Sequence, residues 1–303
     1  MKNSKSKISV FFASFAVCLV LSGCGRKAEP QEVIVATWNI KWFPSGVPQP
    51  QETEYEGRVI ATVARLVREY QPDILCVQEI RDTTALTQMV HQTGLPLHIA
   101  ACSAFPQVRE GIPQQQVAIV TRYPVLESGA ERWTTFGFVD PPRGFAYAVL
   151  DAPVGKIAVF TLHLKSNFIP REAEDPDRIN RLNRMKRELA SQQLRERIHA
   201  LMHRDTDPIQ HVILAGDFNS SLWDERWQDE TTLSSLLDFG FSCALSALPP
   251  GQRYTMDETR LYPATTFDYI FSIGFPAATA RVLPRRWVSD HRMVIARLKA
   301  EPM

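Results

Sequence analysis

The stretch Leu214-Ala-Gly-Asp-Phe-Asn-Ser220 most constrains the fold and the chemistry of this chain. The apolar run that leads into it, residues 211–215, predicts a buried strand. If the chain stays extended past Gly216, the Asp217 carboxylate and the Asn219 amide project on the same side, and Gly216 lets the backbone approach whatever binds there. One group could then hold a water and the other a phosphoryl oxygen. The alternative is an ordinary turn after a strand, because Gly, Asp, Asn and Ser are common turn residues.

Length and composition indicate an ordinary globular protein with a sizeable core. The chain has 303 residues, of which 45% are hydrophobic and 22% are charged. We see no internal repeat, heptad run or low-complexity segment, and no linker long enough to divide the chain after its first residues. We therefore predict a signal peptide at residues 1–23, a tether at residues 24–31 and a single catalytic domain at residues 32–303.

The amino terminus has the build of a signal peptide. Lysines precede an apolar run at residues 8–21 that is too short to span a bilayer comfortably. The run ends in Leu21-Ser22-Gly23-Cys24, which resembles the lipobox of bacterial lipoproteins. That resemblance implies cleavage before Cys24, lipid on its thiol and a membrane anchor in the bacterial cell envelope. Gly25 stands where an Asp would favour the inner membrane, so the outer membrane is expected; a plain secretory signal is the alternative.

Charge and cysteine content limit the partners of the mature chain. Cleavage removes Lys2, Lys5 and Lys7, which leaves 31 basic against 33 acidic residues and a net charge of −2. A protein of this charge does not coat polyanions by bulk attraction, so any phosphate binding must be local. Two cysteines outside the signal and the lipobox, Cys102 and Cys243, could pair in an oxidising compartment, which the sequence leaves open.

The hydrophobic pattern predicts alternating strands and helices. Strands are expected at residues 33–40, 73–79, 97–102, 116–121, 145–151, 157–164, 211–215, 265–271 and 293–298, and helices at 56–70, 83–93 and 177–203. A right-handed crossover makes the first two strands parallel and brings Asn39 and Glu79 to one edge of the sheet. Pro153-Val-Gly155 predicts a hairpin between two later strands.

Basic side chains follow His163 and recur on the long helix. Alternation along the strand sets His163 and Lys165 on one side. The helix is expected to bury an apolar side formed by Leu182, Met185, Leu189, Ile198 and Leu201. Its arginines recur every third residue and should form an exposed basic ridge of Arg178, Arg181, Arg184 and Arg187. Such a ridge is either a solvated helix face or a contact for a phosphate backbone.

Polar groups interrupt the apolar strands at several points. They are Asn39, Glu79, His163, Asp217, Asn219, Asp268, Asp290 and His291. An oxygen-rich set of this kind suits a hard cation such as Mg²⁺ or Mn²⁺. Zinc-site spacing, a Gly-rich phosphate loop, a nucleophile elbow and a dinucleotide fingerprint are all absent from the sequence.

These groups lie in short motifs that follow one another along the chain. The motifs are Trp38-Asn39-Ile40, Gln78-Glu79, Thr161-Leu-His163, Gly216-Asp217-Phe-Asn219, Phe267-Asp268-Tyr-Ile and Ser289-Asp290-His291. In this order they resemble the exonuclease-endonuclease-phosphatase superfamily, over residues 33–298. The resemblance implies an α/β fold, a four-layer sandwich of two mixed β-sheets packed face to face with helices outside. It also places the site at one edge of the sheets.

The resemblance further implies a metal site and a catalytic set. Glu79 is the expected principal metal ligand, and Asn39 and Asp290 complete or support the metal shell. Asp217 and Asn219 are expected to orient the attacking water and the scissile phosphate.

By the same resemblance, two histidines and a carboxylate complete the catalytic set. Asp268 holds His291 in its working tautomer, and His291 acts on the phosphate or the water. His163 is expected to donate a hydrogen bond to a phosphate oxygen.

The residues after His163 indicate the substrate. Lys165-Ser166 is similar to the motif of secreted bacterial nucleases, whereas abasic-site repair enzymes often have Tyr in place of His163. We therefore expect an extracytoplasmic nuclease with nucleic acid as substrate, contacted by Lys165, Arg181 and Arg184. The alternatives are a phosphomonoesterase, a phospholipid phosphodiesterase that places Trp223 and Trp227 on a bilayer, and a non-catalytic phosphate-binding module.

Overall fold

The computed structural model describes residues 31–106, 115–134, 141–259 and 263–300. The predicted signal peptide, Cys24 and nearly all of the tether lie outside the described residues, so these three remain predictions. Within the described ranges, none of the helices combines the length and the apolar character needed to cross a membrane.

Two six-stranded sheets pack face to face. In spatial order, the first contains β11 (Ala277–Val282), β12 (Val294–Ala300), β1 (Gln31–Phe43), β2 (Ile74–Ile80), β4 (Gln116–Thr121) and β3 (His98–Cys102). The second contains β5 (Val125–Arg132), β6 (Gly144–Ala152), β7 (Gly155–His163), β8 (His211–Asp217), β10 (Asp268–Ile273) and β9 (Ser242–Cys243). The pairs β1–β2 and β7–β8 are parallel and the others antiparallel, so both sheets are mixed.

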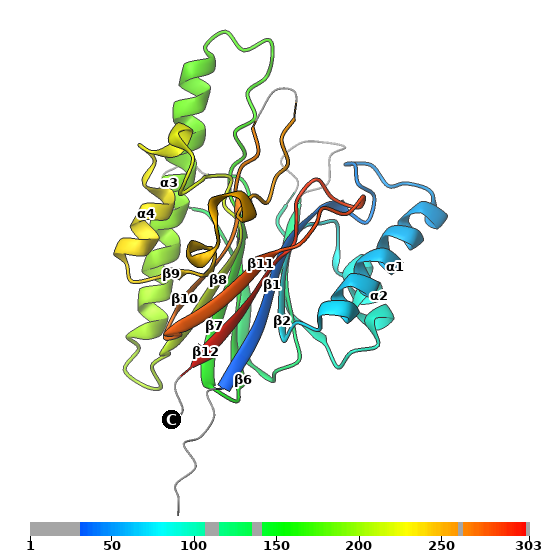
Figure 1. Ribbon diagram of the computed structural model, residues 1–303, viewed down its shortest axis with the longest axis vertical. Helices are drawn as coiled ribbons and strands as arrows, with labels where there is room; N and C mark the ends of the chain where they lie inside the picture. Colours follow the sequence, from blue (N-terminus) through cyan, green and yellow to red (C-terminus); the bar gives the residue numbers. More distant parts are fainter. Residues whose placement is uncertain (1–30, 107–114, 135–140, 260–262, 301–303) are drawn as a thin grey trace, which may run out of the picture.

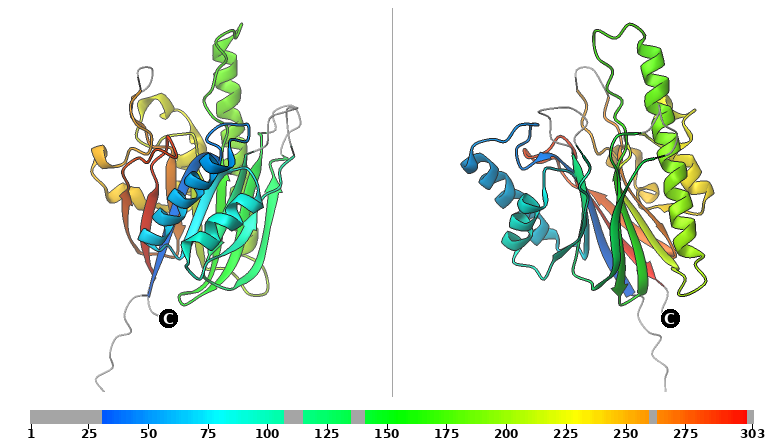
Figure 2. Two further views of the ribbon diagram at one scale, coloured as in Figure 1. Left: turned by 90° about the vertical axis from the view of Figure 1, so that its right-hand side faces the viewer. Right: turned by 180° about the vertical axis from the view of Figure 1, so that it is seen from behind.

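Helices cover the outer face of each sheet (Figures 1 and 2). On one side lie α1 (Thr53–Tyr70) and α2 (Thr83–Thr93), and on the other α3 (Pro176–Met202) and α4 (Thr231–Asp238). The predicted four-layer α/β sandwich is therefore confirmed.

Alternation along the strands explains why each sheet is covered on both faces. On β1, Val33 and Val35 face the core between the sheets, whereas Ala36 and Trp38 join the cluster beneath the helices. Successive side chains of a strand point to opposite faces, so one strand serves two cores. The buried side of α1, including Val59 and Val63, completes the outer cluster.

Most of the predicted elements are present. The hairpin at residues 153–155 and the parallel β1–β2 pair are confirmed, and α2 has the predicted bounds. The prediction missed β5, whose alternate residues face solvent, and also β9, β11 and α4. The strand expected at residues 265–271 would have Asp268 at its middle, whereas Asp268 is the first residue of β10.

The prediction for α3 is wrong over its first half. Met185 is 43% exposed, whereas the Arg187 side chain is 1% exposed and donates to both oxygens of Glu230, at 2.8 and 2.5 Å. This half of the helix projects beyond the sheets, so Met185 has no core to join (Figure 1). Because Arg187 is buried in an ion pair, it does not belong to the exposed basic ridge.

The two candidate disulfide cysteines are free thiols. Cys102 lies on β3, at the edge of the first sheet, and Cys243 lies on β9, at the edge of the second. β3 packs near β5, at the opposite end of the second sheet from β9, so the two thiols are not neighbours.

Gly216 allows β7 and β8 to pack closely, and this contact, not the approach of a ligand, is what requires a glycine there. A Cβ built on it would lie 2.3 Å from the backbone oxygen of Leu162, its partner in the β7–β8 register. Real Cβ atoms do not come this close to a backbone oxygen, so any larger residue must push the two strands apart.

We predict that Gly216→Ala lowers the free energy of unfolding by about 1–3 kcal/mol, the usual cost of an added group in a packed core. Urea denaturation of the purified protein measures it. The matched control is Gly57→Ala on α1, where the added Cβ meets no atom within 4 Å and helix propensity favours alanine. Equal stability of the Gly216 variant and the wild type would contradict this account.

Candidate active site

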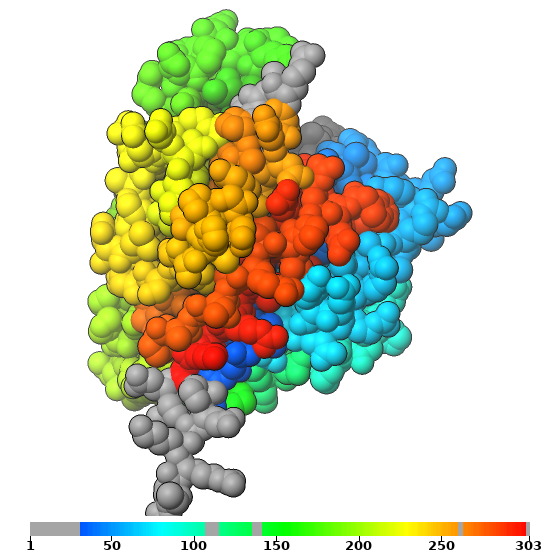
Figure 3. Space-filling view, in the orientation of Figure 1, coloured from blue at the N-terminus to red at the C-terminus, as the bar shows by residue number. Residues whose placement is uncertain are grey.

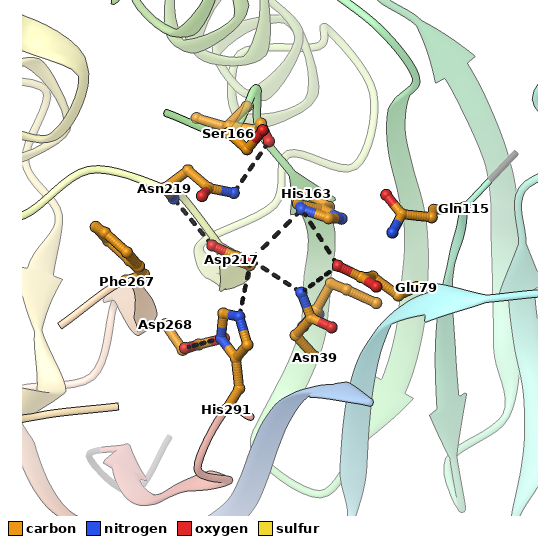
Figure 4. A network of polar contacts seen from close by, with 12 residues as sticks. Asn39, Glu79, Gln115, His163, Ser166, Asp217, Asn219, Phe267, Asp268 and His291 are labelled. Atoms are coloured by element: carbon orange, nitrogen blue, oxygen red, sulfur yellow. Dashed lines mark hydrogen bonds and ion pairs between the residues drawn. The ribbon is translucent and has the colours of Figure 1, made fainter. Parts of the chain in front are cut away.

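Polar side chains from both sheets converge at one edge of the sandwich (Figure 4). The first sheet supplies Asn39 near the end of β1 and Glu79 near the end of β2. In the second sheet, the registers pair both His163 and Asp268 with Asp217. His291 comes from the loop before β12. All except Glu79 are buried, and Glu79 is partly exposed.

The Asn39 amide links the carboxylates of the two sheets. Its Nδ2 donates to Glu79 Oε1 at 3.0 Å and to Asp217 Oδ2 at 2.9 Å. Its Oδ1 accepts from the backbone N–H of Lys41 at 3.0 Å, which sets the orientation of the amide. Glu79 Oε2 accepts from Trp42 N at 3.0 Å, so the last residues of β1 hold the second carboxylate oxygen.

Two histidines face Asp217. Its Oδ2 lies 3.5 Å from His163 Nε2 and 3.8 Å from His291 Nε2. His163 Nε2 also lies 3.9 Å from Glu79 Oε1. On the other side of the His291 ring, Nδ1 lies 2.8 Å from Asp268 Oδ2. Asp268 is thus placed to orient His291, as the sequence predicted, while the catalytic role of the pair stays a prediction.

Burial and neighbouring charges separate the protonation states of these groups. Burial raises the pKa of Asp217, against the opposing effect of His291. For His291, burial acts to lower the pKa, but the Asp268 and Asp217 carboxylates outweigh it and raise the pKa. Burial and the Arg143 charge hold the pKa of His163 well below its usual range. The site therefore combines a cationic histidine, a neutral histidine and a carboxylate suited to accepting a proton.

Asn219 does not continue an extended strand. It has a left-handed φ of 51°, and its backbone N–H donates to Asp217 Oδ1 at 2.9 Å. This closes a turn of the kind that Asp favours, so the turn considered as an alternative is the observed backbone. The Asn219 side chain donates to Leu164 O at 3.2 Å, toward the segment after β7. It remains close to Asp217, but through this turn.

Other predicted residues lie outside the cluster. Asp290 is 43% exposed at its side chain and pairs with Lys41 Nζ at 3.4 Å. Lys165 Nζ donates to Ser166 O at 2.9 Å, and burial with nearby cations lowers the pKa of Lys165 to about 8. Arg184 pairs with Glu188 at 3.1 Å, and Arg181 is exposed on α3. The structure does not bring these four groups into contact with the carboxylates at the sheet edge.

Arg143 is a site residue that the sequence analysis missed. Its guanidinium donates to His163 O at 3.0 Å, to Leu164 O at 2.7 Å and to Gln115 Oε1 at 2.9 Å. It thereby holds the end of β7 that carries His163, and Leu164 O accepts from both Arg143 and Asn219. Arg143 follows two prolines in a loop and interrupts no apolar run, so no pattern in the sequence pointed to it.

The donor set fits a hard divalent cation. Glu79 and Asp217 direct oxygens at the same Asn39 amide, and ligand atoms of Asp217, Asp268 and His291 lie within 4.8 Å of one another. Asp268 and His291 are hydrogen-bonded to each other, so the oxygens of Glu79, the partly exposed carboxylate of the cluster, are the better metal ligands. Mg²⁺ or Mn²⁺ prefers such oxygens and, when bound, would neutralise charge on a phosphate.

The fold and these groups together define a phosphoester-hydrolysing α/β sandwich. A family model for the Endonuclease/Exonuclease/phosphatase family matches residues 36–291, and the chain belongs to this family. Its members are phosphoesterases that depend on divalent metals, and the chain carries a candidate acidic metal site. No curated protein matches the sequence significantly.

Several solved structures share the fold. A family protein from Bacteroides thetaiotaomicron is 16% identical with a TM-score of 0.62, over 90% of this chain and 96% of that one. Truncated TDP2 from Caenorhabditis elegans is 18% identical with a TM-score of 0.57, over 89% and 98%. The mannosyl-6-phosphatase Bt3783 of Bacteroides thetaiotaomicron is 15% identical with a TM-score of 0.57, over 88% and 99%. At these identities the similarity shows the fold alone.

We predict that Glu79→Gln lowers phosphoesterase activity by at least about 100-fold, since one charged oxygen donor is lost where phosphate charge must be offset. Titration with Mn²⁺ should show weaker binding in the same variant. The control is Glu54→Gln, which removes an exposed carboxylate paired with Arg58 on α1. Full activity of the wild type in chelator would contradict a metal role for Glu79.

We predict that Asp268 and His291 act as a unit. Asp268→Asn and His291→Ala should each lower kcat by at least about 100-fold. The kcat of the double variant should be only slightly lower than that of the less active single variant. Steady-state kinetics of the three variants measure this overlap. Losses that multiply would mean that the two residues serve separate functions despite their 2.8 Å contact.

Proposed function

We propose that the protein is a nuclease that acts outside the cytoplasm, is anchored by lipid on Cys24 and hydrolyses phosphodiester bonds with Mg²⁺ or Mn²⁺. The observation that carries this proposal is the position of basic groups beyond the catalytic cluster. Lys165 lies two residues after His163, and Arg181 and Arg184 belong to the first half of α3. This half of the helix projects past the sheets (Figure 1). A polymer that extends from the cluster meets these groups, whereas a small phosphomonoester does not need them.

The cluster supplies the groups that hydrolysis needs. A water oxygen forms a bond to phosphorus, the bond between phosphorus and the leaving oxygen breaks, and the proton of the water passes to the enzyme. Asp217 is suited to accept that proton, because burial raises its pKa. His291, held cationic by Asp268, offsets the charge that grows on the phosphate and can protonate the leaving oxygen.

A phosphomonoesterase is the second candidate. The specific observation in its favour is the fold similarity to the mannosyl-6-phosphatase from Bacteroides thetaiotaomicron. A phospholipid phosphodiesterase is less well supported, because Trp227 lines a pocket and Trp223, although 39% exposed, packs against Tyr269 and Arg253.

We predict that the wild-type protein cleaves DNA or RNA faster than mannose 6-phosphate, inositol phosphates or sphingomyelin. Lys165→Ala should slow cleavage of the polymer. It should also reduce the slope of log binding against log salt concentration by about one, because one fewer counterion is released. The control is Lys156→Ala at the start of β7, where the lysine pairs with Asp207 far along the strand from His163. If the protein hydrolyses a monoester or a lipid but leaves DNA and RNA uncleaved, the nuclease proposal is excluded.

We predict that Cys24→Ser leaves the precursor unprocessed or releases the protein from the membrane fraction, since several acyl chains are needed for a firm anchor. Cell fractionation and the mass of the mature protein measure this. The matched control is Cys18→Ser, which changes a cysteine inside the predicted signal and should leave the anchor unchanged. Normal processing and fractionation of the Cys24 variant would overturn the anchor.

A further inference from the structure

A pocket of about 650 Å³ lies beside the catalytic cluster. Asn219 lines it, which connects the pocket to the turn that follows Asp217. Its other walls come from the segment after β7, from α3, and from the segments after β8 and before β10. The lining residues used below are Asn167, Phe168, Asn180, Arg184, Trp227 and Phe267. Figure 3 shows the projecting end of α3 standing above the yellow and orange segments that form the opposite side.

Aromatic rings form much of the wall of this pocket. Trp227 and Phe267 pack edge to face, with ring centroids 5.4 Å apart and an interplanar angle of 80°. Arg226 lies over the Trp227 ring at 4.6 Å and also pairs with Asp224, so the position of the indole is well determined. Together the two rings give this wall of the pocket an aromatic surface that can contact a planar group.

Phe168 adds a third ring at the rim, although it is 69% exposed. The loop that carries it is nevertheless held in place. Asn183 Nδ2 donates to Phe168 O at 3.2 Å, and Asn167 Nδ2 donates to Asn219 O at 2.8 Å. A phenyl ring exposed in this way does not stabilise the hydrophobic core. Because its loop is held in place beside the pocket, the ring is suited to stacking on a ligand.

Among the described residues that line the pocket, the arginines are paired with carboxylates of the same chain. The guanidinium of Arg187 is paired with Glu230 at 2.5 Å, that of Arg184 with Glu188 at 3.1 Å, and that of Arg226 with an aspartate. A second phosphate in the pocket would therefore have to displace a carboxylate from one of these pairs. The amides of Asn167 and Asn180 offer hydrogen bonds instead, which an acyl chain would leave unsatisfied. The lining thus suits an uncharged planar ring with polar edges.

We propose that this pocket binds the nucleobase of a nucleotide next to the scissile phosphate, and that the enzyme consequently prefers unpaired strands. This inference rests on the proposed nuclease function and narrows its substrate class. A base in a duplex is stacked and paired on its polar edge, so it enters a side pocket only after it leaves the stack. A single strand meets that requirement without the cost of unpairing.

The test compares cleavage of a single-stranded oligonucleotide, the same strand in a duplex, and the same strand with one abasic residue. The purified wild type should cleave the single strand at least about 10-fold more efficiently than the duplex, and cleavage should fall at the phosphate next to the abasic residue. Phe168→Ala and Trp227→Ala should each raise KM for the single strand about 10-fold, as expected for loss of one stacking contact. Neither variant should affect cleavage next to the abasic residue.

Two further variants exclude a general loss of structure. Phe168→Tyr keeps the ring and should restore the wild-type KM. Trp287→Ala removes another exposed ring, which is 59% exposed, packs on Tyr55 of α1 and does not line the pocket. This variant should leave KM unchanged.

The outcomes distinguish a failure of the pocket proposal from a failure of the proposed nuclease function. If the wild type cleaves strands but duplex and single strand react equally, or the two alanine variants keep the wild-type KM, the pocket proposal is wrong and the nuclease stands. If the wild type cleaves no nucleic acid, the proposed function fails and this proposal fails with it.

Discussion

The amide group of Asn39 ties the catalytic edge of one sheet to that of the other. Its Nδ2 donates to Glu79 within its own sheet and to Asp217 across the interface between the sheets. The distance between these carboxylates therefore depends on how closely the sheets pack. Side chains such as Val35 of β1 and Val159 of β7, buried between the sheets, are in this sense part of the site, because they set that spacing.

The sequence predicted where the polar residues of the candidate site lie along the chain better than it predicted how they are arranged in space. Apolar runs that end in a polar residue are local signals, so the strands bearing Asn39, Glu79 and His163 could be located. The inward turn of Arg187 could not, because it depends on Glu230, 43 residues further along the chain. Likewise, Gly216 is required by the backbone of Leu162, a neighbour that only the completed sheet supplies.

Backbone strain gathers around the site. Lys41, Trp42, Glu79 and Arg143 all have a positive φ, a conformation that costs such residues about 1–2 kcal/mol each. The local sequence does not favour these conformations, and no periodic pattern reveals them. They are held by contacts made in the folded state, such as the hydrogen bond from Trp42 N to Glu79 Oε2. The stability of the sandwich thus maintains a catalytic edge that its own segments would not adopt in isolation.

The direction of β1 has a consequence for a lipid-anchored enzyme. The strand begins at Gln31, at the opposite end of the sheet from the catalytic edge, and Asn39 follows eight residues later, about 26 Å along the strand. A tether joined at Gln31 would therefore attach to the pole of the molecule remote from its active site. Held in this way, the enzyme would turn its catalytic edge toward the surrounding fluid and meet molecules that diffuse to it, while the lipids of its own membrane would lie behind it.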